Sequence, residues 1–200
     1  GKAALNDEWT KLGNRSTWRL SSVREKQHVV NESKQKNKPV HFGELMELCH
    51  IKHSELPSQS HKYKGRVVFG GNDVRDEWDY AIFNELSSCP ATMQAAKTAD
   101  AYSLLPGNLM EMADAEQAYC QALLGGTTTW VRLPRDQWPK HWEGMSDPVC
   151  PLKLALYGHP DAGGYWEKHC YSVLQSVGWV PVPGWRSCYW HRECSTFLIV

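Results

Sequence analysis

Residues 109–119 constrain the fold of this chain more than any other stretch. Leu109, Met110 and Met112 lead to one acid, Asp114, and small and polar residues follow as far as Tyr119. The pattern is typical of a half-buried strand that ends in a carboxylate and turns into a short helix. A carboxylate at a strand end is held rigidly beside a cleft, which suits a metal ligand. Local sequence alone favours a plainer role for Asp114 as the N-cap of a helix.

Composition indicates a packed, intracellular protein. Its 200 residues are enough for one domain or two small subdomains with a substantial core, and ten of them are Trp. No apolar run reaches membrane-spanning length and no signal peptide opens the sequence. The seven cysteines are odd in number and scattered, so we expect reduced thiols rather than a disulfide framework.

Charge is distributed unevenly along the chain. Residues 1–70 contain 13 Lys and Arg against 7 Asp and Glu, whereas residues 71–200 contain 9 against 15. A basic half beside an acidic half suits a protein that binds phosphates on one side and cations on the other. Charge also segregates on surfaces without function, so this signal is weak.

The order of the predicted elements favours an α+β fold. Residues 40–50 and 63–69 predict a hairpin with a long loop, and residues 91–105, between Pro90 and Pro106, predict the clearest helix. Residues 115–124 and 165–177 predict further helices. The remaining predicted strands are 109–114, 127–133, 149–157, 179–182, 187–190 and 196–200.

Six motifs occur in an order that is informative as a set. Glu8-Trp9 with Thr17-Trp18-Arg19-Leu20 opens the chain, and Tyr63-Lys64-Gly65-Arg66-Val67-Val68 follows. The next are Met112-Ala113-Asp114-Ala115-Glu116-Gln117-Ala118-Tyr119 and Trp130-Val131-Arg132-Leu133-Pro134. The last are Val149-Cys150-Pro151-Leu152-Lys153-Leu154-Ala155-Leu156-Tyr157-Gly158 and Ser176-Val177-Gly178-Trp179. Together they resemble the reverse transcriptase domain of copia-type retrotransposon Pol polyproteins over most of the chain.

The resemblance implies a fold of fingers and palm. Residues 1–89 would form mainly the fingers and residues 90–200 mainly the palm, with segments of the two interleaving. The palm would be an antiparallel sheet with helices 91–105 and 165–177 packed on one face. The run Phe197-Leu198-Ile199-Val200 resembles the strand that leads to the family's aromatic-Val-Asp-Asp motif, and it would lie beside residues 109–114. We therefore expect Asp-Asp shortly after Val200 in the parent gene, and no polymerisation by these 200 residues alone.

The resemblance also implies RNA-directed DNA polymerase chemistry with two Mg²⁺ (or Mn²⁺) ions, which prefer oxygen ligands. Asp114 would be the catalytic metal ligand, and the backbone carbonyl of Ala115 would add a second oxygen. Lys64 and Arg66, on one side of a strand, would bind the triphosphate of the incoming nucleotide. Tyr119 would pack under its sugar and exclude a 2′-hydroxyl. The remaining nucleotide-binding positions implied are Gln117, Tyr157 and Gly158.

The partners implied are an RNA or DNA template-primer, deoxynucleoside triphosphates and the rest of the polyprotein, with integrase upstream and RNase H downstream. The location implied is the cytoplasm, virus-like particles or the nucleus, with no membrane. The sequence departs from the family pattern at Gly70, at Tyr119, and at His159-Pro160-Asp161-Ala162-Gly163-Gly164 after Tyr157-Gly158.

Two alternatives stay open. The first is a decayed or domesticated remnant that folds but catalyses nothing. The second is a zinc module, because Cys49-His50-x-x-His53 and Cys188-x-x-His191-x-x-Cys194 carry ligand-like residues at close spacing. These two clusters lie far apart in the sequence and match known zinc spacings loosely.

Overall fold

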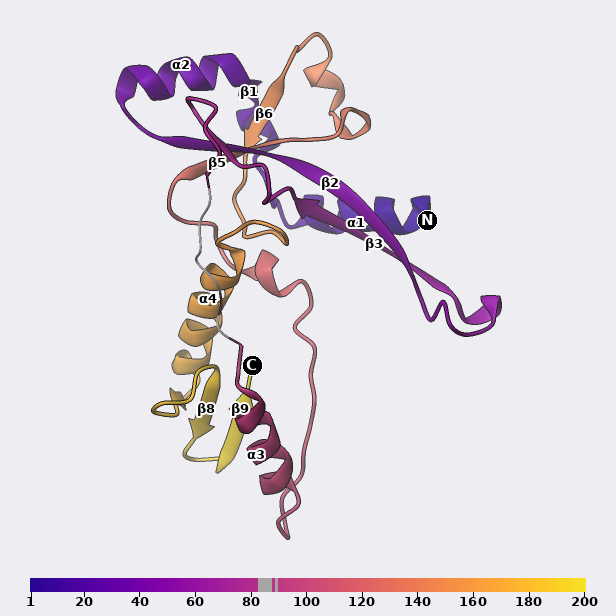
Figure 1. Cartoon of the computed structure of the whole chain (residues 1–200), viewed down its shortest axis with the longest axis vertical. Helices are drawn as coiled ribbons and strands as arrows, with labels where there is room; N and C mark the ends of the chain where they lie inside the picture. The colour runs from indigo at the N-terminus through magenta and orange to yellow at the C-terminus, as the bar shows by residue number, and fades with distance from the viewer. Residues whose placement is uncertain (83–87, 89) are drawn as a thin grey trace.

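A computed structural model describes residues 1–82, 88 and 90–200, and it shows an elongated α+β molecule built around two sheets (Figure 1). The upper part in Figure 1 holds the larger sheet with helices α1 and α2. The lower part holds α3, α4 and the smaller sheet. No helix in these residues is long and apolar enough to cross a membrane.

The larger sheet has six strands and draws them from both sides of residue 90. Its order is β1 (Arg24–Glu25), β6 (Pro148–Pro151), β5 (Thr128–Arg132), β2 (Val40–Lys52) and β3 (Lys62–Phe69), and β4 (Arg75–Asp76) also pairs with β2. β2 and β5 are parallel, and the other pairs are antiparallel. Strands of the expected fingers and palm segments therefore share one sheet.

The predicted hairpin is confirmed as β2 and β3, which protrude together at the right of Figure 1. Their register runs from Leu45 opposite Phe69 to Lys52 opposite Lys62. Helix α1 (Lys2–Asn14) packs along β3, where Gly65 leaves room for the α1 backbone. Trp9 and Leu12 form its buried stripe, and the indole nitrogen of Trp9 donates a hydrogen bond to Glu47 on β2 at 2.5 Å.

Apolar side chains fill both faces of this sheet. One core cluster contains Phe69, Val131, Trp142 and Leu156, all at most 1 % exposed. A second lies under helix α2 (Lys26–Lys36), whose Val29 packs with Val40, Phe42, Trp130 and Val149. Only one stripe of α2 is buried, and its other faces carry charged and polar residues.

The lower part confirms three predicted strands and two predicted helices. The strands are β7 (Trp179–Pro181), β8 (Cys188–His191) and β9 (Thr196–Ile199), in one antiparallel sheet. Helix α4 (Ala162–Ser176) contacts β7, and α3 (Met93–Ser103) contacts β9. Helix α3 begins at Thr92, whose hydroxyl accepts the Ala95 amide at 3.2 Å as an N-cap.

The predicted strand at 109–114 is wrong. These residues form no strand or helix, and the segment runs alone from α3 toward the middle of the molecule (Figure 1). Leu109 is 92 % exposed and Met112 96 % exposed. An apolar alternation becomes a strand only when a neighbouring backbone supplies hydrogen bonds, and β9 pairs with β8 instead of with this segment.

Two further predicted elements are shorter in the structure than in the prediction. The helix predicted at 115–124 is one turn of 3₁₀ helix, η3 (Ala118–Gln121). The strand predicted at 149–157 is β6, which ends at Pro151 and continues as isolated bridges at Leu152 and Leu154. The other short 3₁₀ turns are η1 (Leu20–Ser22), η2 (Ser58–Ser60), η4 (Arg135–Gln137) and η5 (Lys140–Trp142).

Candidate functional site

Three of the predicted nucleotide-binding residues meet although they come from separate motifs. The Arg66 guanidinium carbon, on β3, lies 6.0 Å from the ring centroid of Tyr157. The Tyr119 ring, on η3, lies 4.7 Å from the Tyr157 ring, centroid to centroid, with the planes inclined at 40°. We call Arg66, Tyr119 and Tyr157 the Arg–Tyr–Tyr cluster. A cation beside two packed phenol rings can contact both a planar ring and an anionic group.

A close backbone crossing puts Tyr157 in this place. The Phe69 amide at the end of β3 donates a hydrogen bond to the Tyr157 carbonyl at 2.7 Å. Gly158 has φ +88°, and a Cβ there would overlap the Phe69 carbonyl oxygen. A Cβ at Gly71, on the other side of the crossing, would likewise overlap the Gly158 carbonyl oxygen. Gly158, a predicted site residue, is thus required for the geometry of its neighbours.

The Tyr157 phenol stays neutral at physiological pH. Partial burial raises the pKa of Tyr157, the nearby Cys120 thiol adds to the effect, and the positive charge of Arg66 opposes it. Burial raises the pKa of Cys120 itself to about 12. The cluster therefore offers one fixed cation and a phenolic hydroxyl that can donate a hydrogen bond.

Tyr119 is positioned by the turn that carries it. Gln117 adopts φ +50° at the start of η3, and the Ala122 amide donates to the Tyr119 carbonyl at 2.9 Å. The Tyr119 ring packs against a small cluster of buried alanines, Ala122, Ala155 and Ala162. The Gln117 side-chain nitrogen is buried without a hydrogen-bond partner. Gln117 thus flanks the cluster, with an amide donor still to be satisfied.

Lys64 and Arg66 lie on one face of the hairpin, as their spacing predicts, because they stand opposite His50 and Leu48 in the β2–β3 register. Gly65 and Val67 point to the other face, toward α1 and the core. The uncovered face carries no acid, and we call it the basic hairpin face. Its members are Met46, Leu48, His50, Lys52, Lys62, Lys64, Arg66 and Val68.

No helix or strand holds the predicted metal ligands beside the Arg–Tyr–Tyr cluster. Asp114 and Ala115 are exposed and lie outside every helix and strand. Over the described ranges, no three His, Cys, Asp or Glu side chains are grouped so as to hold a metal ion. In the second cysteine–histidine motif, the Cys194 amide donates to Nδ1 of His191 at 3.3 Å and Nε2 of His191 lies 2.9 Å from the Val177 carbonyl. Backbone groups therefore occupy both ring nitrogens of His191.

A pocket is lined in part by Tyr119. It brings Tyr119 and Val200, at the end of the smaller sheet, to one concave surface. Its other lining residues are Ser88, Pro90, Trp166, Glu167, Cys170, Ser187 and Tyr189. The stretch that follows β9 and the turn that holds Tyr119 thus face the same space.

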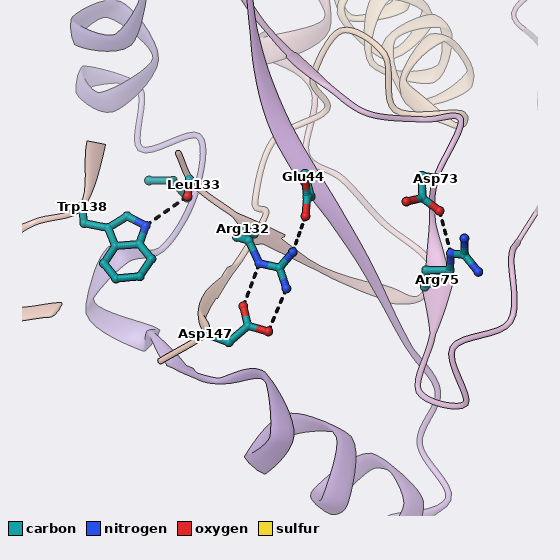
Figure 2. Close-up of polar contacts among 7 residues, drawn as sticks. All are labelled: Glu44, Asp73, Arg75, Arg132, Leu133, Trp138 and Asp147. Atoms are coloured by element: carbon teal, nitrogen blue, oxygen red, sulfur yellow. Dashed lines mark hydrogen bonds and ion pairs between the residues drawn. The ribbon is translucent and has the colours of Figure 1, made fainter. Parts of the chain in front are cut away.

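Sequence reasoning passed over an ion-pair network that joins β2, β5 and the residue before β6 (Figure 2). The Arg132 guanidinium on β5 donates two parallel hydrogen bonds to Asp147, each 2.7 Å, and also pairs with Glu44 on β2. Arg75 donates to Asp73 nearby at 2.6 Å. Lys26, Glu44, Asp73, Arg75 and Arg132 line a cleft there, but most of its cations already have carboxylate partners. No motif signals this network, because its members are far apart in sequence.

His159 is a further residue that the sequence did not single out for function. It is 7 % exposed and directly follows Tyr157 and Gly158. The only signal was that residues 159–164 depart from the family pattern.

Comparison with known proteins adds no relative, since no protein-family model, curated protein or solved structure matches the chain.

Proposed function

We propose that this chain is the nucleotide-binding and template-primer-binding part of a retrotransposon reverse transcriptase. One observation carries the proposal. Arg66, Tyr119 and Tyr157 come from three motifs that resemble the copia-type enzyme, and they meet at one place. The three motifs are separated by about 50 and about 40 residues in the sequence, so their similarity to the family does not by itself require them to converge.

Each member of the cluster has a role in this proposal. Arg66, with Lys64 beside it on the basic hairpin face, would bind the triphosphate of a deoxynucleotide. Tyr119 and Tyr157 would pack against its sugar and base, which have apolar faces. The remaining cations of the hairpin face, Lys52 and Lys62, would contact the phosphates of the template strand.

The residues present do not fit a two-metal centre by themselves. Asp114 is a single exposed carboxylate, and two divalent ions about 4 Å apart need several oxygen ligands from rigid elements. Mg²⁺ or Mn²⁺ binding at Asp114 and Ala115 therefore remains part of the proposal for the whole enzyme. We expect no primer extension by these 200 residues alone.

The position of Asp114 favours a second candidate, a remnant that binds nucleic acid without catalysis. Such a protein would keep the Arg–Tyr–Tyr cluster and the hairpin face but would not need an ordered metal ligand. Both candidates predict nucleotide binding, and only the first predicts polymerisation.

Equilibrium dialysis with radiolabelled dTTP and Mg²⁺ tests the shared part. We expect Arg66→Gln to weaken dTTP binding about tenfold or more, since a charge-assisted contact is worth about 1.5–3 kcal/mol. Arg192→Gln removes an equally exposed arginine on the turn between β8 and β9 and should leave binding unchanged. Equal losses in the two variants, or no dTTP binding, would refute the proposal.

Primer extension by the complete gene product, whatever its length, separates the two candidates. If the protein is a polymerase, it extends an RNA-templated primer and Asp114→Asn abolishes extension while dTTP binding by the Arg–Tyr–Tyr cluster persists. If the protein is a remnant, neither form extends the primer.

A further inference from the structure

His159 joins three elements beside the backbone crossing that places Tyr157. Its ring packs on Phe69 of β3 with centroids 4.9 Å apart. Nε2 lies 3.3 Å from the Thr129 hydroxyl on β5. Nδ1 accepts the Asp161 amide at 3.2 Å, where the chain enters α4. The same ring therefore contacts both sides of the crossing that places Tyr157 and Gly158.

These contacts fix which nitrogen carries the proton. Because the Asp161 amide is a donor, Nδ1 must present its lone pair, so the single proton of the neutral ring is on Nε2. Nε2–H then donates to the Thr129 hydroxyl, whose own proton points to the Thr127 carbonyl at 3.5 Å. A second proton on the ring would place Nδ1–H against the Asp161 amide, donor against donor.

We propose that His159 is a positioning residue for the nucleotide site, and that protonation of its ring loosens the Tyr157–Gly158 crossing and the Arg–Tyr–Tyr cluster above it. The inference rests on the proposed function for its ligand. The effect proposed on the crossing depends on no ligand, because it follows from the contacts of His159 with Phe69, Thr129 and Asp161. The mechanism is a lost hydrogen bond at Asp161 together with a charge placed in an apolar core.

The charged neighbours of His159 include one group that raises its pKa and one that lowers it. Burial lowers the pKa of His159 to about 4, Asp161 at the start of α4 opposes the shift, and His41 on β2 adds to it. Burial also lowers the pKa of His41, against the opposing charges of Asp161, Glu77 and Asp76. The ring is accordingly neutral at neutral pH and the crossing is closed there.

Nuclear magnetic resonance of the nucleotide-free chain tests the crossing directly. Imidazole ¹⁵N shifts should show the Nε2–H form of His159. The Tyr157 and Gly158 amides should titrate with the midpoint of His159, well below 6.5, and this titration should vanish in His159→Gln. An Nδ1–H form, or Gly158 shifts that ignore His159, would overturn the proposal.

Thr129 variants test the link to nucleotide even if His159→Gln fails to fold. Thr129→Val keeps the shape but removes the acceptor for Nε2–H, and it should weaken dTTP binding about fivefold or more at pH 7.5. Thr129→Ser keeps the hydroxyl and should restore binding. Equal affinities for the Val and Ser variants overturn the nucleotide role. Absence of dTTP binding in every protein refutes the proposed function instead, and the NMR titration then still decides whether His159 positions the crossing.

Discussion

Gly158 and His159 show how much of the candidate site depends on two adjacent residues. Gly158 leaves room for the β3 backbone, and His159 ties that crossing to β5 and α4. Neither role is visible in the sequence, because each depends on atoms contributed by β3 and β5, about 90 and 30 residues away. The motif Tyr157-Gly158 suggested a site, but the structure supplies the reason why its second residue is glycine.

Replacement of Gly158 by alanine should destabilise the protein strongly. The left-handed φ costs a non-glycine residue about 1 kcal/mol, and overlap of the new Cβ with the Phe69 carbonyl adds about 1–3 kcal/mol. Gly107→Ala is the matched control, because Gly107 has φ +87° with no atom near its Cβ position. Urea denaturation should show Gly158→Ala to be the worse variant by more than 1 kcal/mol. Equal losses would mean that the crossing is not tight.

The buried His159 should make the protein less stable in acid. An unfolded histidine has a pKa near 6.5, whereas the folded pKa is about 4. Between these values the unfolded chain binds a proton that the folded chain does not, so the free energy of unfolding falls as pH falls. From pH 7.5 to pH 5 the loss is on the order of 2 kcal/mol. Urea denaturation of the wild type and His159→Gln at both pH values isolates this part, since carboxylate effects are common to the two.

Among the elements, those with local signals were the predictable ones. The β2–β3 hairpin, α3, α4 and β7 to β9 follow from turn residues, caps and alternation that lie within each segment. The alternation of residues 109–114 looks the same, but a strand there needs a partner backbone that local sequence does not specify. The failure matters for function, because Asp114 was the predicted metal ligand and its rigidity depended on that strand.

The ion pairs of Arg132 should stabilise the larger sheet more than that of Arg75 does. Arg132 joins β5, β2 and the residue before β6, with two parallel hydrogen bonds to Asp147 and side chains only 36–37 % exposed. We expect Arg132→Met to lower the free energy of unfolding by about 1–2 kcal/mol. Arg75→Met breaks a pair whose partner Asp73 is 65 % exposed, so it should lower the free energy of unfolding less than Arg132→Met does. Chemical denaturation at low salt measures both, and a larger loss in Arg75→Met would contradict this assignment.

At the scale of the whole molecule, the structure gives the excess positive charge of residues 1–70 a location. Part of it lies on the basic hairpin face, where β2 and β3 extend beyond the other strands of the larger sheet (Figure 1). The sequence indicated the sign and the segment, but only the register shows that Lys52, Lys62, Lys64 and Arg66 share a face. Met46 and Leu48 lie at one end of this face, and under the proposed function its four cations would contact a nucleic-acid backbone.

Nucleic-acid binding should therefore depend on salt and on this face in particular. Each phosphate contact to a single strand releases counterions that contribute about 0.7 to the slope of log K against log salt. Lys52→Gln with Lys62→Gln should lower that slope by about 1.4 and weaken binding similarly for every sequence, because phosphates carry no sequence information. Lys97→Gln with Lys168→Gln removes the same charge from α3 and α4 and should lower affinity much less. Fluorescence anisotropy of a labelled oligonucleotide from 50 to 300 mM salt gives both slopes. If the two double variants lost affinity equally, the effect would come from net charge, and the hairpin face would not be the nucleic-acid surface.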